Sequence, residues 1–103
     1  MSFDMNNLGA MAMQLQQRMM EAKAQAELQT AEGQAGGGLV RVVATGAGLI
    51  ESIEISDQAY EDKAMVEDLV RAASNDALRK AKELVAISMS QATGGMPLPP
   101  GLF

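Results

Sequence analysis

The chain has 103 residues, which is enough for one domain and not two, so we expect a single domain over residues 1–103 with flexible ends at 1–7 and 92–103. It contains no Cys and no His, which excludes disulfides, thiolate chemistry and the commonest general base and metal ligand. The formal net charge of −5 argues against a generic binder of polyanions. One Tyr and two Phe are too few for a surface that stacks single-stranded bases.

No apolar run approaches the ~20 residues that span a bilayer, and the N-terminus lacks the basic start of a signal peptide. We therefore expect a cytoplasmic protein without membrane contact. The charge is uneven along the chain: residues 63–103 are the most basic part, with five basic and four acidic side chains. Any contact with nucleic acid is then expected from local basic stretches and not from the field of the whole protein.

An amphipathic helix is predicted over about residues 7–25. Apolar side chains recur there at the spacing of one helical face, and the polar residues between them are good helix formers. The stripe consists of Leu8, Met11, Ala12, Leu15, Met19, Ala22 and Ala26. Residues 26–34 then show a rough alternation that predicts a first strand.

Two further strands are predicted at residues 39–45 and 49–56, because both segments are rich in β-branched residues. Gly36–Gly38 and Gly46–Gly48 separate the strands and can supply the positive φ of a tight turn. Three short strands joined in this way predict an antiparallel meander. Simple alternation assigns one face of the third strand to Leu49, Glu51, Ile53 and Ile55.

A long second helix is predicted from about Lys63 to Ser90, after a connector in which Asp57 can cap a short turn and Asp62 can cap the helix. Such a helix is roughly 40 Å long, whereas short strands span about 15–20 Å. Half of the helix must overhang the sheet, yet its apolar stripe continues, so we expect a homodimer that covers it. The stripe consists of Val66, Leu69, Val70, Ala73, Ala77, Ala81, Leu84 and Ile87.

Several features favour a plain structural interpretation. The acidic residues from Glu51 to Asp68 lack the spacing of a calcium loop, which favours a solvated surface over a cation site. Gly36–Gly38 leads into a strand without the Lys and Ser/Thr of a phosphate-binding loop, which favours a turn. Core or interface packing is favoured over an adaptable binding groove for Met5, Met11, Met13, Met19, Met20, Met65, Met89 and Met96.

Asn75 and Asp76 lie in the middle of the second predicted helix, although neither is a good helix former. Two interpretations remain open for them. They are exposed at the surface, or a side chain forms a hydrogen bond to the connector or across a dimer.

The most basic stretch of the chain lies on the same helix. Arg71 and Lys82 are separated by about three helical turns and share a face, and Arg79 lies near it. A solvated helix face and contact with DNA phosphates, which fixes position without reading sequence, both remain open. The candidate residues are Arg71, Arg79, Lys80 and Lys82, together with Arg18 and Lys23 on the first helix.

Four segments in combination resemble the YbaB/EbfC family of bacterial nucleoid-associated proteins: GGGLVRVVATG (36–46), IESIEIS (50–56), EDKAMVEDLVRAASNDALRKAKE (61–83) and GGMPLPPGLF (94–103). The resemblance implies an α+β fold with an αβββα protomer, in which two long helices flank a three-stranded antiparallel sheet. It also implies an intertwined homodimer whose helical arms bind double-stranded DNA. In the family the first and last helices contact DNA, which corresponds here to Arg18, Lys23, Arg71, Arg79, Lys80 and Lys82. The first helix departs from the family pattern in having few basic residues.

We therefore expect a non-enzymatic homodimer that binds double-stranded DNA at the nucleoid and affects nucleoid organisation or gene expression. We expect no cofactor, no metal and no small-molecule substrate. The alternative is a protein-interaction adaptor of the same fold with little affinity for DNA, which the net charge favours. An enzyme is a distant third possibility, because without His or Cys catalysis would rest on carboxylates or Lys, and no pair has a suitable spacing.

Overall fold

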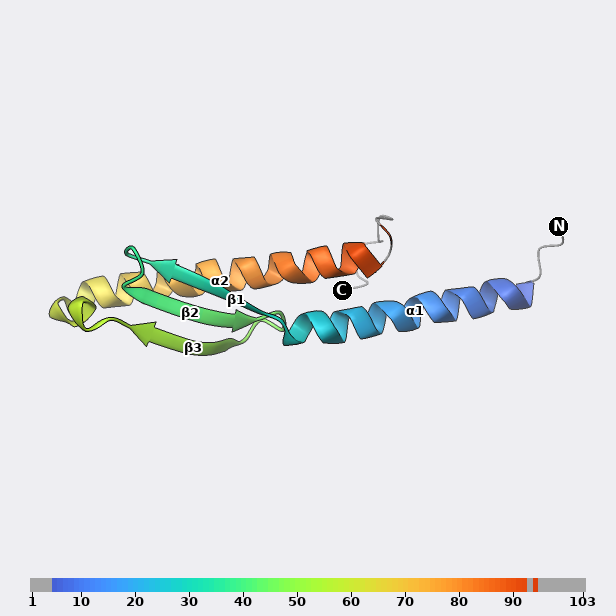
Figure 1. Ribbon diagram of the computed structural model, residues 1–103, viewed down its shortest axis with the longest axis horizontal. Coiled ribbons are helices and arrows are strands. Elements are labelled where there is room, and N and C mark those ends of the chain that lie inside the picture. The colour runs from blue at the N-terminus through green and yellow to red at the C-terminus, as the bar shows by residue number, and fades with distance from the viewer. Residues whose placement is uncertain (1–4, 93, 95–103) are drawn as a thin grey trace.

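The computed structural model describes residues 5–92 and 94, with side chains from residue 7 onward. The elements in chain order are α1 (Met5–Leu28), β1 (Thr30–Ala35), β2 (Val40–Thr45), β3 (Ile50–Ile55), a 3₁₀ helix η1 (Asp57–Glu61) and α2 (Lys63–Ala92). This confirms the predicted αβββα order. The molecule measures 72 × 18 × 18 Å because α1 projects far beyond the sheet (Figure 1). Most of the ends that we expect to be flexible lie outside the described residues, although α1 already begins at Met5.

The first helix is longer than predicted, and the first strand begins later. The alternation through Ala26 and Leu28 favoured a strand, but Ala26 also continues the helical stripe from Ala22, and the helical spacing prevails. Ala26 is buried, and its carbonyl accepts a hydrogen bond from Gln29 N–H at 3.1 Å. The chain therefore turns at Gln29, and β1 starts at Thr30.

The three strands form an antiparallel sheet in the order β1-β2-β3. Gly36, Gly37 and Gly38 all have positive φ values (66°, 67° and 93°), which confirms the predicted turn between β1 and β2. A bulge interrupts the register of β2 and β3, so that Ala44 pairs with Ile50 while Val42 pairs with Ile53.

This bulge corrects the face assigned to β3. Strict alternation placed Leu49 and Glu51 on the face of Ile53, but the extra residue brings Ile50 onto that face instead. The face is therefore fully apolar along β3, with Ile50, Ile53 and Ile55 opposite the buried residues of β2.

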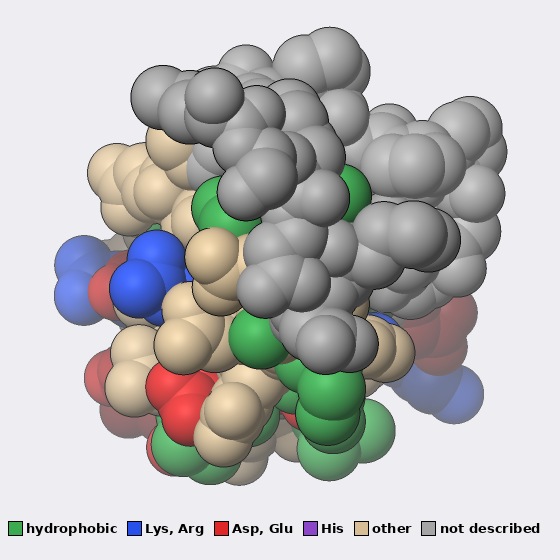
Figure 2. Space-filling model, turned by 90° about the vertical axis from the view of Figure 1, so that its right-hand side faces the viewer, with side chains coloured by type: hydrophobic (Ala, Val, Ile, Leu, Met, Phe, Trp, Pro, Cys, Tyr) green, Lys and Arg blue, Asp and Glu red, His purple; other side chains and the backbone are tan. Residues whose placement is uncertain are grey.

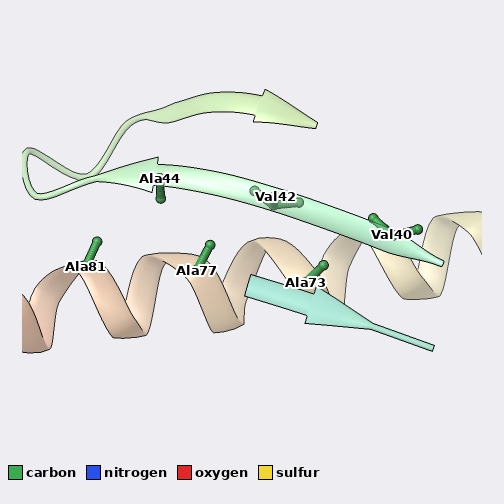
Figure 3. Close-up of a cluster of buried hydrophobic side chains, with 6 residues drawn as sticks. All are labelled: Val40, Val42, Ala44, Ala73, Ala77 and Ala81. Carbon is green, nitrogen blue, oxygen red and sulfur yellow. The ribbon is translucent and has the colours of Figure 1, made fainter. Parts of the chain in front are cut away.

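The core lies between β2 and α2 and is built mostly from alanine. Figure 3 shows three side chains of β2 facing three side chains of α2 that are spaced one turn apart. All six are at most 1% exposed: Val40, Val42, Ala44, Ala73, Ala77 and Ala81. Among the described side chains, the largest that are fully buried are Met89, Val40 and Val42. Such a core is small for a chain of this length.

Small residues bring the sheet and the helices into close contact. A Cβ added at Gly33 in β1 would overlap the backbone nitrogen of Ala77 and the carbonyl oxygen of Ala73, both in α2. A Cβ added at Gly46, after β2, would overlap the carbonyl oxygen of Ala26 in α1. Glycine at these two positions allows both helices to lie directly on the backbone of the sheet.

The long helix α2 covers one part of the sheet and leaves another open. It packs against β1 and β2 and barely reaches β3, so Ile50 and Ile53 remain 40% and 48% exposed. Its C-terminal half runs beside the C-terminal half of α1 in the opposite direction, where Met89 is buried (Figure 1). Part of the predicted overhang is thus covered by α1 of the same chain, whereas Ile87 is 54% exposed.

The start of α2 follows the predicted capping only in part. Asp62 Oδ1 accepts a hydrogen bond from Met65 N–H at 3.2 Å, which confirms Asp62 as the residue that caps the helix. Asp57 lies inside η1, and the residue before it, Ser56, makes no side-chain cap hydrogen bond. The predicted capping role of Asp57 was therefore wrong.

Candidate nucleic-acid interface

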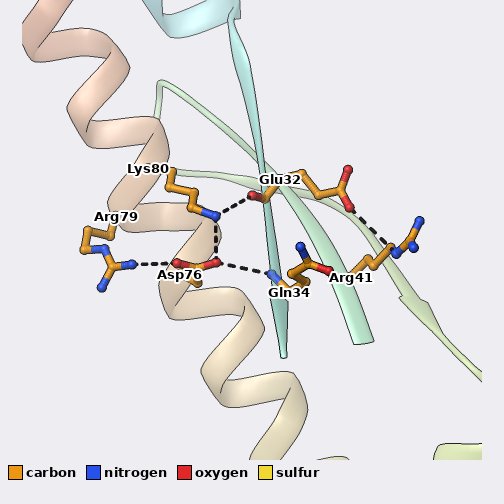
Figure 4. A network of polar contacts seen from close by, with 6 residues as sticks. All are labelled: Glu32, Gln34, Arg41, Asp76, Arg79 and Lys80. Carbon is orange, nitrogen blue, oxygen red and sulfur yellow. Dashed lines mark hydrogen bonds and ion pairs between the residues drawn. The ribbon is translucent and has the colours of Figure 1, made fainter. Parts of the chain in front are cut away.

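Asp76, near the middle of α2, forms ion pairs with two of the six candidate cations, Arg79 and Lys80. Its Oδ1 lies 2.6 Å from Arg79 Nη2, and its Oδ2 lies 3.0 Å from Lys80 Nζ (Figure 4). The same Oδ2 accepts a hydrogen bond from the Gln34 backbone N–H in β1 at 3.3 Å. The Asp76 side chain is only 20% exposed, so one carboxylate is shared by two cations and a strand.

These contacts protect the free edge of the sheet. β1 is an edge strand, and the Gln34 N–H bonded by Asp76 belongs to that edge. Lys80 Nζ also donates to the Glu32 carbonyl at 3.4 Å, so α2 supplies partners to a donor and an acceptor of β1 (Figure 4). Within the chain, Asp76 thus accepts its backbone hydrogen bond from β1 and not from the connector.

We expect replacement of Asp76 by Asn to lower the melting temperature near neutral pH. The hydrogen bond from Lys80, and then that from the Gln34 backbone, hold the pKa of the Asp76 carboxyl below its ordinary value of 3.8. A carboxyl whose pKa is lower in the folded state adds stability above its unfolded pKa and loses it as pH falls through the folded pKa. The difference in melting temperature between the two proteins should therefore be present at about pH 7 and shrink below about pH 4.

Asp68→Asn is the matched control, because it removes the same charge from the same helix. Asp68 pairs with Arg71 at 3.3 Å, but both side chains are more than 70% exposed, and such pairs add little stability. An equal loss in both variants, or a loss for Asp76→Asn that is independent of pH, would contradict the role assigned to Asp76.

The remaining candidates make no ion pair within the part of the chain that the structure describes. They are Arg18 and Lys23 on α1 and Lys82 on α2. Lys23 lines a hollow between α1 and α2. Lys82 lines an apolar hollow of about 460 Å³, here called the turn hollow, between α2 and the β2–β3 turn. The turn hollow is lined by Thr45, Gly46, Ala47, Gly48, Leu78, Lys82, Val85 and Ala86.

The six candidates do not form one patch. Lys80 reaches the edge of β1, whereas Lys82 lines the turn hollow on the other flank of the buried alanine stripe. Arg71 shares a helical face with Lys82, as the spacing predicted, and Arg79 points to Asp76. The structure thus distributes the cations over α1 and both flanks of α2.

The open face of the sheet is acidic and carries few cations. Glu32 and Glu54 lie there with a single arginine, Arg41, whose Nε is 3.9 Å from Glu32 Oε1. In the end-on view of Figure 2, basic, acidic and hydrophobic side chains lie close together on the part not covered by grey atoms. This face of the sheet is therefore a less favourable surface for phosphates than the basic stretches of the helices.

The described residues offer neither a metal site nor a helix that could span a membrane. No group of three or more acidic side chains there could hold a metal ion. None of the described helices has the length and hydropathy that crossing a membrane requires.

Comparison with known proteins identifies the family. The model of the YbaB/EbfC DNA-binding family matches residues 1–96. The chain belongs to this family. Among solved structures, this YbaB/EbfC protein is similar to the uncharacterized protein HP0035 from Helicobacter pylori, with a TM-score of 0.66 over 80% of this chain and 88% of that chain. The sequence identity is 23%, so this likeness shows the shared fold.

Sequence reasoning missed one feature of this YbaB/EbfC protein, the bond from Asp76 to the edge of β1. The signal was present, because Asp76 and Lys80 are spaced one helical turn apart as an acid followed by a base. The spacing predicts an ion pair on the helix surface. Only the packing of α2 against β1 turns that pair toward the strand.

Proposed function

We propose that the protein binds double-stranded DNA as a homodimer and acts at the nucleoid, where it affects DNA organisation or gene expression. The family match over residues 1–96 is the observation that carries this proposal. The uneven charge supports it further, because the helices hold cations that no described acidic side chain neutralises. Binding through phosphates alone fixes the protein on the duplex without reading sequence.

The homodimer is supported by what one chain leaves uncovered. The core of one copy is mostly alanine, and the radius of gyration is 19.5 Å, against about 13 Å for a compact chain of 100 residues. Ile50 and Ile53 lie on β3, at the part of the sheet that α2 does not cover. A second copy packed there would enlarge the core and cover the open edge of β3.

Arg18, Lys23 and Lys82 are the residues that we assign most directly to phosphate contact. Each is without an ion pair among the described residues, so no internal contact must break when a phosphate binds. Arg71 comes next, because its pair with Asp68 is exposed. Arg79 and Lys80 share the single charge of Asp76, so this cluster still offers one net positive charge.

The test is a mobility-shift series on duplex DNA over a range of salt concentrations. The variant combines Arg18→Gln, Lys23→Gln and Lys82→Gln, which removes up to six cations from a dimer. We expect the magnitude of the slope of log Kobs against log salt to fall by up to about 5, since each phosphate contact contributes about 0.9. Binding at low salt should weaken at least about tenfold.

Lys63→Gln is the control for a general change of charge. Lys63 lies at the start of α2, is 91% exposed and pairs with Glu67 at 4.0 Å. The Lys63→Gln variant should leave the slope of log Kobs against log salt nearly unchanged. A wild-type protein that gives no shift at low salt, or one whose shift does not depend on salt, would remove the proposal of DNA binding.

The rival function is a protein-interaction adaptor. The exposed apolar side chains of α1, among them Met11 and Met13 at 62% and 72% exposure, favour it together with the net charge of −5. After nuclease treatment, recovery of one stoichiometric protein partner, combined with no mobility shift, would favour the adaptor over the DNA-binding protein.

A further inference from the structure

The N-terminal half of α1 carries an apolar stripe that nothing described covers. Leu8, Met11 and Leu15 are 45%, 62% and 38% exposed, although they continue the face that Ala22 and Ala26 pack against α2. The stripe ends in a hollow of about 340 Å³ whose lining includes Leu15, Met19 and, from α2, Met89. The opposite side of this part of the helix is mixed: Gln14 and Gln17 lie there together with Met13, which is 72% exposed.

The end of α2 lies beside this stripe. Ser88, Gln91 and Ala92 face Ala22 and Gln25 of α1 across a shallow hollow. Beyond them Gly94 adopts a φ of 66°, and its N–H bonds the Gln91 carbonyl at 3.2 Å, which is how a helix commonly ends. The described part of the chain therefore ends next to α1, close to the uncovered stripe.

The sequence that follows suits an apolar groove. Residues 95–103, GMPLPPGLF, contain no charged side chain. Their three prolines favour an extended polyproline conformation, which has little conformational entropy to lose on docking. Nine residues at about 3.1 Å each reach roughly 28 Å, whereas the stripe from Leu8 to Met19 is about 17 Å long.

We propose that residues 96–103 dock in an extended form along the uncovered stripe of α1 in the same chain, between Met19 and Leu8. Leu98 and the residues after it pack on Leu15 and Met11. Methionine side chains suit such a surface because they are flexible and adapt to the shape of a partner. This docking goes beyond the proposed function and does not depend on DNA binding.

The tail of the same chain is a better occupant than a second molecule. Because the tail starts beside α1, its effective concentration at the stripe is in the millimolar range. A second copy has its own uncovered surface at Ile50 and Ile53, which lie on the sheet and not on this part of α1.

Cysteine cross-linking tests the proposal directly, because the chain has no native Cys. We compare the pair Leu15→Cys and Leu98→Cys with the pair Gln17→Cys and Leu98→Cys in the full chain. Gln17 lies two residues after Leu15 in α1 and faces away from the stripe. In a glutathione redox buffer, an intramolecular disulfide should form at least about tenfold more favourably for Leu15 than for Gln17.

Each outcome decides the proposal. A preferred intramolecular disulfide at Leu15 supports it. Equal cross-linking of the two pairs, or none at either, overturns it. A disulfide that joins two chains at Leu15 also overturns it and assigns the stripe to a second copy.

Amide hydrogen exchange gives a second readout without added cysteines. In a chain that ends at Gly94, residues 8–20 should exchange faster than in the full chain, while β2 exchanges at the same rate. Identical exchange of residues 8–20 in the two proteins would overturn the docking of the tail.

Discussion

Replacing Gly33 with alanine should destabilise the protein by at least about 3 kcal/mol and abolish its cooperative folding at moderate denaturant. The added methyl group would overlap the Ala77 nitrogen and the Ala73 carbonyl oxygen. Both are backbone atoms of α2, so they cannot avoid the methyl group by a change of rotamer. The helix would have to move away from β1, and this would open the alanine core beside it. Urea unfolding followed by circular dichroism measures the loss.

Gly9→Ala makes the same chemical change at a site with the opposite expectation. Gly9 lies inside α1, and nothing lies within 4 Å of an added Cβ there. Alanine should therefore stabilise the helix by about 0.5–1 kcal/mol. If Gly33→Ala shows an unchanged urea midpoint, the close contact between β1 and α2 is wrong.

Replacing Ile53 with aspartate should convert the proposed homodimer into a monomer. Ile53 lies on the apolar face of β3 that α2 leaves open, where we place the partner subunit. Burying an unpaired carboxylate in an apolar interface costs several kcal/mol, so the dissociation constant should rise by more than about a hundredfold. Light scattering after gel filtration should give 10.8 kDa for the variant and twice that mass for the wild-type protein.

Ser52→Asp is the control on the neighbouring residue of the same strand. Ser52 pairs with Val43 and lies on the opposite, open face of the sheet, so the same charge should leave the dimer intact. A monomeric wild-type protein at micromolar concentration would overturn the homodimer. If the Ile53→Asp variant is still a dimer, the interface does not include the apolar face of β3.

The elements of this fold could be predicted where one spacing dominates the local sequence. The stripe from Val66 to Ala81 and the absence of Gly and Pro predicted α2 from Lys63, and Asp62 caps it as expected. The boundary between α1 and β1 was harder, because Ala26 and Leu28 fit both an alternating strand and a helical face. The register of β3 was wrong by one residue after the turn, because a bulge leaves no clear mark in a short strand.

The sequence assigned the candidate cations to two predicted helices, but it could not show which surface of the folded protein each cation faces. Arg71 and Lys82 share a face as their spacing requires. The spacing along α2 could not reveal that Lys80 faces β1 while Lys82 faces the turn hollow, because that depends on which flank of the helix each strand covers.

The sequence by itself determined the order of the elements, the turn at Gly36–Gly38 and the apolar stripes of both helices, because these depend on residues that are close in the chain. The tertiary structure alone decided how closely α2 approaches β1 at Gly33, which flank of α2 faces the edge of β1, and that α1 covers the far end of α2. These features depend on contacts between segments more than 40 residues apart, such as Gln34 and Asp76, and no local spacing encodes such contacts.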